Sequence, residues 1–214
     1  MPTTHWALFE VLGEERYDTE IIRALLADKV LFPPGLEKLG SDTIVVPSKA
    51  FLNLPVSISI SDLELFFKTL AECHKCDRVV RRGEIDPNSP IRHSGHVMLY
   101  CHAKHKHADY DPGDDTKISK SPGWITIVEH GIKQSFDMEK VMFSRGNVTE
   151  KKRFGGMVKE GEVVLDLYAG IGYYTLPALI LGKAAMVHAC EWNEEAGESS
   201  LDVISQYCSL RSTN

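Results

Sequence analysis

Two short apolar runs in the C-terminal part of the chain, each followed by an acidic residue, form its clearest pattern. The first is Val163–Leu165 followed by Asp166, and the second is Ala185–Cys190 followed by Glu191. Apolar runs of this length are typical of strands in a parallel sheet. The apolar segment Tyr174–Leu181 between them stops at a glycine, which predicts a helix. The pattern therefore predicts a strand–helix–strand unit.

Small residues form the turn between the first strand and this helix. The turn reads Ala169-Gly170-Ile171-Gly172, and glycines let the backbone approach a ligand closely. About twenty residues further on, the carboxylate of Glu191 can bind both hydroxyls of a ribose. We therefore predict a nucleoside-binding βαβ unit in which Asp166, Gly170 and Gly172 lie under the ligand. A purely structural turn in another α/β protein is the alternative.

The residues after the turn favour S-adenosylmethionine over NAD as the nucleoside. A dinucleotide site has a third glycine three residues after the second, where helix and strand pack beneath a pyrophosphate. Here that position is Thr175, and two bulky residues, Tyr173 and Tyr174, precede it. Their rings suit an adenosine or methionine moiety better than a diphosphate.

The rest of the chain predicts a helical start followed by a strand-rich middle. Apolar spacing of three to four predicts helix within residues 6–30 and over Ser61–Lys75, the latter with Ser61 as N-cap and Glu64 at the capping-box position. Short strands are predicted at Thr43–Pro47, Arg78–Arg82, Val97–Cys101, Trp124–Glu129 and Ile132–Phe136, the last two forming a hairpin.

These elements predict three parts. Residues 1–41 form an N-terminal helical segment, residues 42–141 a β-rich α+β accessory module, and residues 142–214 an incomplete nucleoside-binding α/β domain. The segment 142–154 reads as a turn that leads into a basic helix and then into the first strand. It can therefore fold over the nucleoside pocket; an interdomain linker is the alternative.

Composition is typical of a globular protein of one or two domains. The 214 residues are 43% hydrophobic and 25% charged. No apolar run approaches the roughly eighteen residues of a membrane span, and the N-terminus does not resemble a signal peptide. We therefore expect a cytoplasmic protein without membrane contact, as a monomer, and its five cysteines as reduced thiols.

The chain offers half of a zinc site. Cys73 and Cys76 have zinc-ligand spacing, but His102, His105 and His107 lack a partner pair of cysteines at finger spacing. We expect no metal, with Cys73 as a core residue.

Basic residues concentrate in the middle of the chain although the net charge is −6. Residues 68–153 hold sixteen of the 24 Lys and Arg, twelve of the 30 Asp and Glu, and seven of the nine His. Within them, Arg78, Arg81 and Arg82 are the candidate nucleic-acid contacts, since guanidinium groups bind phosphates as forks. Pairing of these arginines with carboxylates is the alternative.

With these residues laid out, the sequence resembles the tRNA wybutosine-synthesising aminocarboxypropyltransferases, relatives of the tRNA guanine-N1 methyltransferases. The Phe-Ser-x-Gly-Asn-x-Thr-Glu-Lys segment is the most specific part of the resemblance. The matching stretches are Leu36–Asp42, Arg81–Ile85, Met142–Lys151, Val164–Tyr174 and Ala189–Asn193.

The resemblance implies a class I S-adenosylmethionine-dependent methyltransferase (Rossmann-like) fold. It further implies transfer of the 3-amino-3-carboxypropyl group of S-adenosylmethionine to the modified guanosine at position 37, in the anticodon region of phenylalanine tRNA. The family's contacts to S-adenosylmethionine fall on Ser144, Lys151 and Glu191. Lys151 would neutralise the methionine carboxylate, and Ser144 would donate a hydrogen bond. Orientation of the donor can carry most of the catalysis, so no catalytic residue is named.

The chain departs from the family after Asn193, where several further strands and helices are expected. Residues 196–200 lack the pattern of an amphipathic helix, although Leu201, Val203, Ile204 and Tyr207 could form one turn or two. The polar end matches nothing in the family. We expect a form shortened by splicing or by an incomplete gene model. A two-stranded remnant leaves one face and one edge of its sheet uncovered. It should bind S-adenosylmethionine weakly, with little or no transferase activity.

Two other functions remain open from the sequence. One is a tRNA guanine37-N1 methyltransferase, which uses the same donor but gives its methyl group. The other is a non-catalytic tRNA-binding isoform that keeps the β-rich module.

Overall fold

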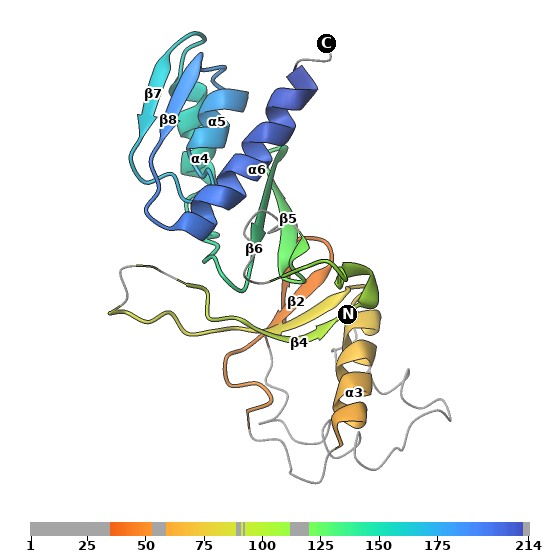
Figure 1. Cartoon of the computed structure of the whole chain (residues 1–214). Coiled ribbons are helices and arrows are strands. Elements are labelled where there is room, and N and C mark those ends of the chain that lie inside the picture. Colours follow the sequence, from red (N-terminus) through yellow and green to blue (C-terminus); the bar gives the residue numbers. More distant parts are fainter. Residues whose placement is uncertain (1–34, 53–58, 89–90, 92, 112–119, 212–214) are drawn as a thin grey trace. The chain divides into compact units, whose positions relative to one another are not determined.

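The computed structural model describes residues 35–52, 59–88, 91, 93–111 and 120–211 (Figure 1). The helix predicted within residues 6–30 lies outside them. The chain divides into two compact units. The first takes the described residues up to Glu84 together with Gly95–Lys106, and the second takes Ile85–Ser94 together with the described residues from His107 onward.

The first unit is a four-stranded mixed sheet carrying one helix. The strand order is β1-β2-β3-β4, with β2 and β3 parallel and the outer pairs antiparallel. The helix α3 (Ile60–Cys73) is the crossover that parallel neighbours need. The strands are β1 (Glu37–Leu39), β2 (Thr43–Val46), β3 (Arg78–Arg81) and β4 (Val97–Cys101), followed by the short 3-10 helix η1 (Ala103–His105).

Aromatic rings fill the space between α3 and the sheet. Phe66 and Phe67 of α3 meet Phe51 edge to face, with ring centroids 5.5 and 5.2 Å from it. Ile44 and Val79, paired across β2 and β3, complete the core. The apolar periodicity of the helix and the β-branched residues of the strands thus account for this unit.

The start of α3 differs from the prediction. The N-cap is Ser59, whose side chain accepts a hydrogen bond from the Asp62 N–H, and not Ser61. Ser59 and Asp62 repeat, two residues earlier, the spacing seen in Ser61 and Glu64. The sequence therefore offers two capping signals, and the helix begins at the earlier one.

The predicted hairpin is confirmed. Strands β5 (Trp124–Glu129) and β6 (Ile132–Asp137) pair antiparallel, and Glu129 faces Ile132. The two turn residues, His130 and Gly131, have φ of +51° and +80°. Positive φ at both positions fits the twist of the strands they join.

The hairpin belongs to the second unit. The boundary predicted at residue 141, which grouped the hairpin with the β-rich module, therefore does not coincide with the division between the two units. The His130 imidazole lies 3.0 Å from the Val148 carbonyl oxygen, at the start of α4 (Val148–Met157). These contacts join the hairpin to the rest of the second unit.

The predicted βαβ unit is also present. β7 (Val163–Asp166) and β8 (Met186–Ala189) are parallel, with Asp166 opposite Ala189. The helix α5 (Thr175–Ile180) connects them and ends before Gly182. These bounds lie within one residue of the predicted ones.

The helix after β8 is longer than the one or two turns predicted from the sequence. The helix α6 (Glu194–Arg211) runs beside α5 and packs on β6 (Figure 1). Its buried face begins with small residues, and further along Val203, Ile204 and Tyr207 pack against Ile132 and Leu176. Because small residues give little apolar periodicity, the sequence pattern hid a helix that packs closely. The small buried residues are Ala196, Ser199 and Ser200.

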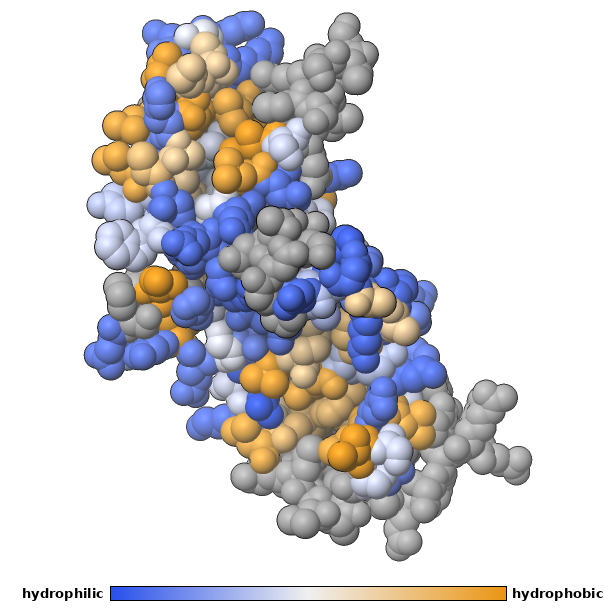
Figure 2. Space-filling view, in the orientation of Figure 1, coloured by the Kyte–Doolittle hydropathy of each residue, from blue (hydrophilic) through white to orange (hydrophobic). Residues whose placement is uncertain are grey.

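The outer surface of β7 and β8 is apolar and open to solvent. Val163, Leu165 and Met186 expose 65%, 63% and 52% of their surface. Figure 2 shows hydrophobic side chains gathered over these two strands. The predicted uncovered face of the parallel sheet is therefore present. Among all the described residues, no helix is long and apolar enough to cross a bilayer.

We expect truncation of Phe66 to destabilise the first unit strongly. Its side chain is fully buried in the core between α3 and the sheet. Phe66→Ala should therefore lower the free energy of unfolding by about 3–5 kcal/mol. Urea unfolding followed by circular dichroism measures the change. Ile60→Ala on the same helix is the control, because Ile60 is 85% exposed; equal losses in both variants would contradict the assigned core.

Candidate functional site

The turn after β7 and the acidic residue after β8 lie at the same edge of the sheet. The strand pairing continues past the strand ends: the Cys190 N–H donates to the Asp166 carbonyl at 2.7 Å, and the Ala169 N–H donates to the Cys190 carbonyl at 3.0 Å. Ligands of open α/β folds bind at this carboxyl edge. The structure therefore brings together the two parts of the predicted nucleoside site.

Glu191 is fastened to the turn. Its Oε2 accepts the Gly170 N–H at 2.6 Å, and its Oε1 accepts the Asn193 N–H at 2.7 Å. Gly170 and Gly172 have φ of +56° and +90°, which only glycine adopts without strain. The carboxylate is half-buried and retains free lone pairs, since a carboxylate offers about four acceptor sites.

Asp166 holds the start of α5. Its Oδ2 accepts the Thr175 hydroxyl at 2.7 Å, and its Oδ1 accepts the Tyr168 N–H at 3.3 Å. Thr175 is buried at the position where a dinucleotide site has its third glycine. The hydroxyl gives this position a structural role that glycine cannot perform.

Tyr173 fastens the segment before α4 to the turn. Its hydroxyl oxygen accepts the Ser144 N–H at 2.8 Å, and the hydroxyl donates to the Met142 carbonyl at 3.2 Å. This segment therefore packs against the turn 169–174, and its role as a wall of the nucleoside pocket stays a prediction. Burial raises the pKa of the Tyr173 hydroxyl to about 12, the Ser144 N–H opposes this rise, and the Glu129 carboxylate adds to it.

Lys151 lies at the centre of this cluster. Its side chain is 5% exposed. The Nζ donates to Glu129 Oε2 at 2.8 Å and to the Ser144 carbonyl at 3.3 Å, and it lies 4.4 Å from the centre of the Tyr173 ring. Glu129 ends β5, so the ion pair links the hairpin to α4. The ammonium thus has two oxygen partners and two aromatic rings beside it, since the centre of the Phe143 ring lies 5.5 Å away.

The six predicted donor-binding residues form two groups that Tyr173 joins. Asp166, Gly170, Gly172 and Glu191 surround the turn, and Ser144 and Lys151 lie on the other side of Tyr173. The Ser144 hydroxyl has no hydrogen-bond partner within the described ranges, so it can donate to a ligand.

The three predicted tRNA contacts fare differently. Arg78 is buried at 2% exposure, and its guanidinium bonds Asp42 at 2.6 Å. Its prediction as a phosphate contact is therefore wrong: a strand residue facing the core needs a carboxylate partner for its charge. Arg82 is exposed and lies 2.6 Å from Glu37. Arg81 is partly exposed, without an ion-pair partner among the residues that the structure places.

One group of side chains could bring three ligand atoms to a cation in the described part of the chain. Asp42, Asp77 and His105 have ligand atoms within 4.8 Å of one another. Arg78 already bonds Asp42, and Lys104 lies 2.7 Å from Asp77. Because these cations neutralise the carboxylates, we assign no metal there. The cysteines that are described are free thiols; they are Cys73, Cys76, Cys101 and Cys190.

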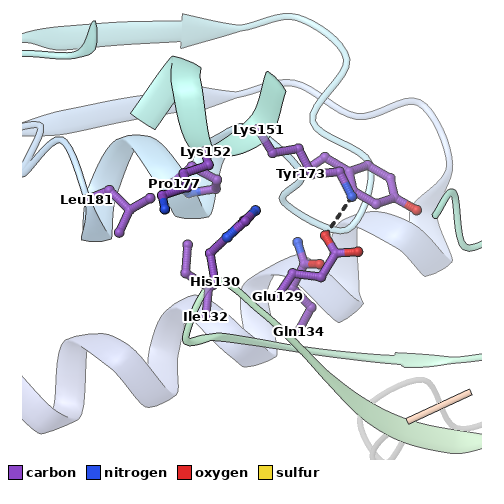
Figure 3. A pocket seen from close by; sticks show the side chains of 9 residues that line it. All are labelled: Glu129, His130, Ile132, Gln134, Lys151, Lys152, Tyr173, Pro177 and Leu181. Atoms are coloured by element: carbon purple, nitrogen blue, oxygen red, sulfur yellow. Dashed lines mark hydrogen bonds and ion pairs between the residues drawn. The ribbon is translucent and has the colours of Figure 1, made fainter. Parts of the chain in front are cut away.

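A small pocket opens beside Lys151, between the hairpin and helices α4 and α5 (Figure 3). Figure 3 shows polar side chains gathered at one end and the apolar Pro177 and Leu181 at the other. The polar end includes Glu129, Gln134, Lys151 and Tyr173. Sequence reasoning missed Glu129, Gln134 and the bridging role of Tyr173, because only the fold brings them beside Lys151.

Comparison with known proteins agrees with this geometry. Residues 126–204 match the family described as the TRM5/TYW2 methyltransferase domain. A human tRNA wybutosine-synthesizing protein 2 homolog is 55% identical over 130 residues, which are 61% of this chain and 25% of that protein. This part of the chain is similar to the TRM5/TYW2 methyltransferase domain. An Arabidopsis thaliana tRNA wybutosine-synthesizing protein 2/3/4 is 38% identical over 78% of this chain and 14% of its own length.

Solved structures place the TRM5/TYW2 domain in the predicted fold class. Pyrococcus horikoshii TYW2, in complex with MeSAdo, matches with a TM-score of 0.57 at 24% identity, over 94% of this chain and 59% of that one. The Methanocaldococcus jannaschii tRNA m1G37 methyltransferase matches with a TM-score of 0.52 at 17% identity, over 92% and 48%. The predicted methyltransferase fold preceded by an α+β module is confirmed. The chain spans about a quarter or less of the two curated relatives.

We expect Gly172→Ala to destabilise the turn of the TRM5/TYW2 domain. An added Cβ would lie 2.9 Å from Leu176 Cγ, at a φ of +90°. The free energy of unfolding should fall by about 1–3 kcal/mol in urea titrations. Gly156→Ala in α4 is the control, because its added Cβ meets nothing within 4 Å. This variant should gain up to about 1 kcal/mol from helix propensity; a neutral Gly172→Ala would contradict the described turn.

Stability should fall at high pH because of Tyr173. Because the pKa of Tyr173 is about 12 in the folded protein and 10.0 for an ordinary tyrosine, the unfolded chain loses this phenolic proton first as the pH rises. The resulting stability is fully present below pH 10 and is lost towards pH 12, by about 1.4 kcal/mol per pH unit. Unfolding at stepped pH measures the slope, and Tyr173→Phe should lack this component. Equal slopes in both proteins would contradict the burial of the hydroxyl.

Proposed function

We propose that the turn 169–174 binds the nucleoside of S-adenosylmethionine. The observation that carries this proposal is the Glu191 carboxylate, fastened to the Gly170 N–H at the carboxyl edge of two parallel strands. A carboxylate in that place suits the two hydroxyls of a ribose. Pyrococcus horikoshii TYW2 is described in complex with MeSAdo, which concerns that protein and supports the same choice.

Glu191, Ser144 and Lys151 fit such a ligand. Two lone-pair positions of Glu191 are used by backbone N–H groups, and the remaining ones can accept from ribose hydroxyls. The Ser144 hydroxyl and the Lys151 ammonium lie across Tyr173 from the turn, on the side where the methionine end of the donor would extend. Lys151 is held in place before the ligand arrives, which lowers the cost of ordering its side chain on binding.

The whole protein, in our proposal, transfers the 3-amino-3-carboxypropyl group to the modified guanosine at position 37 of phenylalanine tRNA. The support is the name of the curated relatives, tRNA wybutosine-synthesizing protein 2, at up to 55% identity. S-adenosylmethionine would supply an electrophilic carbon next to its sulfonium. The residues of this chain would bind and orient it: Glu191 at the ribose, and Ser144 and Lys151 at the amino-acid end.

Methyl transfer to guanine N1 is the second candidate, because tRNA m1G37 methyltransferases share the fold at TM-scores above 0.5. Mass spectrometry of the reacted tRNA separates the two reactions, since a methyl group adds far less mass. Tight tRNA binding without turnover would instead support the non-catalytic isoform.

The proposed tRNA contacts are Arg81, the last residue of β3, and Arg82, which follows it; both keep some exposure. Arg78 drops out because it is buried. Related Trm5 is named in a complex with tRNALeu, which supports a tRNA partner in general. The anticodon region of phenylalanine tRNA, the monomeric state and the cytoplasmic location stay predictions.

Removal of the Glu191 carboxylate should weaken donor binding. Calorimetry with S-adenosylhomocysteine, which cannot react, should show at least about tenfold weaker binding to Glu191→Ala, because bonds to a charged acceptor are lost. Glu194→Ala, three residues away and exposed, is the matched control. Equal affinities for the two variants would contradict the ribose role, and absence of binding to the unmodified chain would contradict the donor site.

A further inference from the structure

The pocket beside Lys151 contains a buried polar atom that has no hydrogen-bond partner among the described residues. Gln134 of β6 is 2% exposed. Its side-chain carbonyl oxygen is buried without a hydrogen-bond donor among the residues that the structure describes. Buried polar atoms are nearly always bonded to protein, water or ligand. Since Gln134 lines the pocket, its carbonyl is suited to accept from a group that enters there.

A second acceptor lines the same pocket. Glu129 is bonded to Lys151 through Oε2 only, and no bond to its Oε1 occurs within the described residues. Figure 3 shows Gln134 close behind Glu129, on neighbouring strands of one hairpin. The pocket thus offers one cation and two acceptors at the same end.

This set of charges selects the class of ligand. A simple anion would be attracted by Lys151 but repelled by Glu129, and a simple cation would meet the reverse. A zwitterion with a carboxylate and an ammonium on one carbon satisfies both, and its N–H groups can reach two acceptors. An α-amino acid group has this chemistry.

Tyr173 places the pocket next to the nucleoside turn. It directly follows Gly172 in the chain, its ring lies under the Lys151 ammonium, and its side chain lines the pocket. A nucleoside over the turn can therefore extend its attached amino-acid group past Tyr173 towards Lys151.

We propose that Glu129 and Gln134 of the hairpin bind the α-ammonium of the donor's amino-acid end while Lys151 binds its carboxylate. The proposal rests on the proposed donor site and adds the hairpin to it. Glu129 then shares its carboxylate between Lys151 and the ligand's ammonium. The carbonyl oxygen of Gln134 accepts a hydrogen bond from the same ammonium.

Three ligands and one near-isosteric variant test this. S-adenosylhomocysteine carries both groups, its deaminated analogue keeps only the carboxylate, and 5′-methylthioadenosine lacks the amino-acid end. Gln134→Met removes the unsatisfied carbonyl at similar volume. This variant should weaken the binding of S-adenosylhomocysteine by about tenfold, which is the effect of losing one hydrogen bond to a charged group. Binding of the other two ligands should stay unchanged. Ligand-observed NMR, which reports weak binding, provides the affinities.

Matched variants keep the result interpretable. Lys133→Met lies next to Gln134 on β6 but is exposed, and it should leave all three affinities unchanged. Glu129→Gln should weaken the binding of S-adenosylhomocysteine more than the binding of the deaminated analogue. Circular dichroism melting checks that each variant is folded.

The outcomes separate the two proposals. Equal weakening of all three ligands by Gln134→Met would make the role structural and overturn the inference, as would an unchanged affinity for S-adenosylhomocysteine. Either result leaves the nucleoside site intact, because 5′-methylthioadenosine still reports it. If none of the three ligands binds the unmodified chain, the proposed donor site itself is wrong.

Discussion

The buried ammonium of Lys151 is the interaction on which the second unit depends. A lysine charge removed from water is tolerated only when it is paired and hydrogen-bonded. Glu129 from the hairpin, the Ser144 carbonyl and the Tyr173 ring supply those contacts. Three segments that are distant in sequence are thereby fixed around one charge. The same charge is the natural partner for a ligand carboxylate, so the packing and the proposed binding site share one group.

Sequence reasoning succeeded where a local rule and the tertiary structure agree. The βαβ unit was predictable because apolar runs of strand length flank a glycine turn and an apolar segment of helix length, and all of these signals are local. The hairpin was predictable because His130-Gly131 suits a two-residue turn. It failed where partners come from distant strands. Arg78 reads as a basic surface residue until Asp42 is seen beside it, and the small buried face of α6 carries almost no periodic signal.

The site follows the same division. Glu191 and the two glycines could be assigned from spacing, because the turn itself needs them. The role of Tyr173 could not be predicted. Its hydroxyl bonds Ser144 and Met142, about thirty residues earlier in the chain, and no sequence pattern indicates these contacts. Glu129 and Gln134 were invisible for the same reason, since alternation along a strand says which face they occupy but not which helix covers it.

The central claim is that the glycine turn and Glu191 hold an adenosine nucleoside. An amide-resolved NMR titration with S-adenosylhomocysteine tests it most directly. The account predicts ligand-dependent shifts at the N–H groups of Gly170, Gly172 and Asn193, with further shifts at Ser144 and Lys151. Shifts confined to the first unit, or unchanged spectra at millimolar ligand, would contradict it.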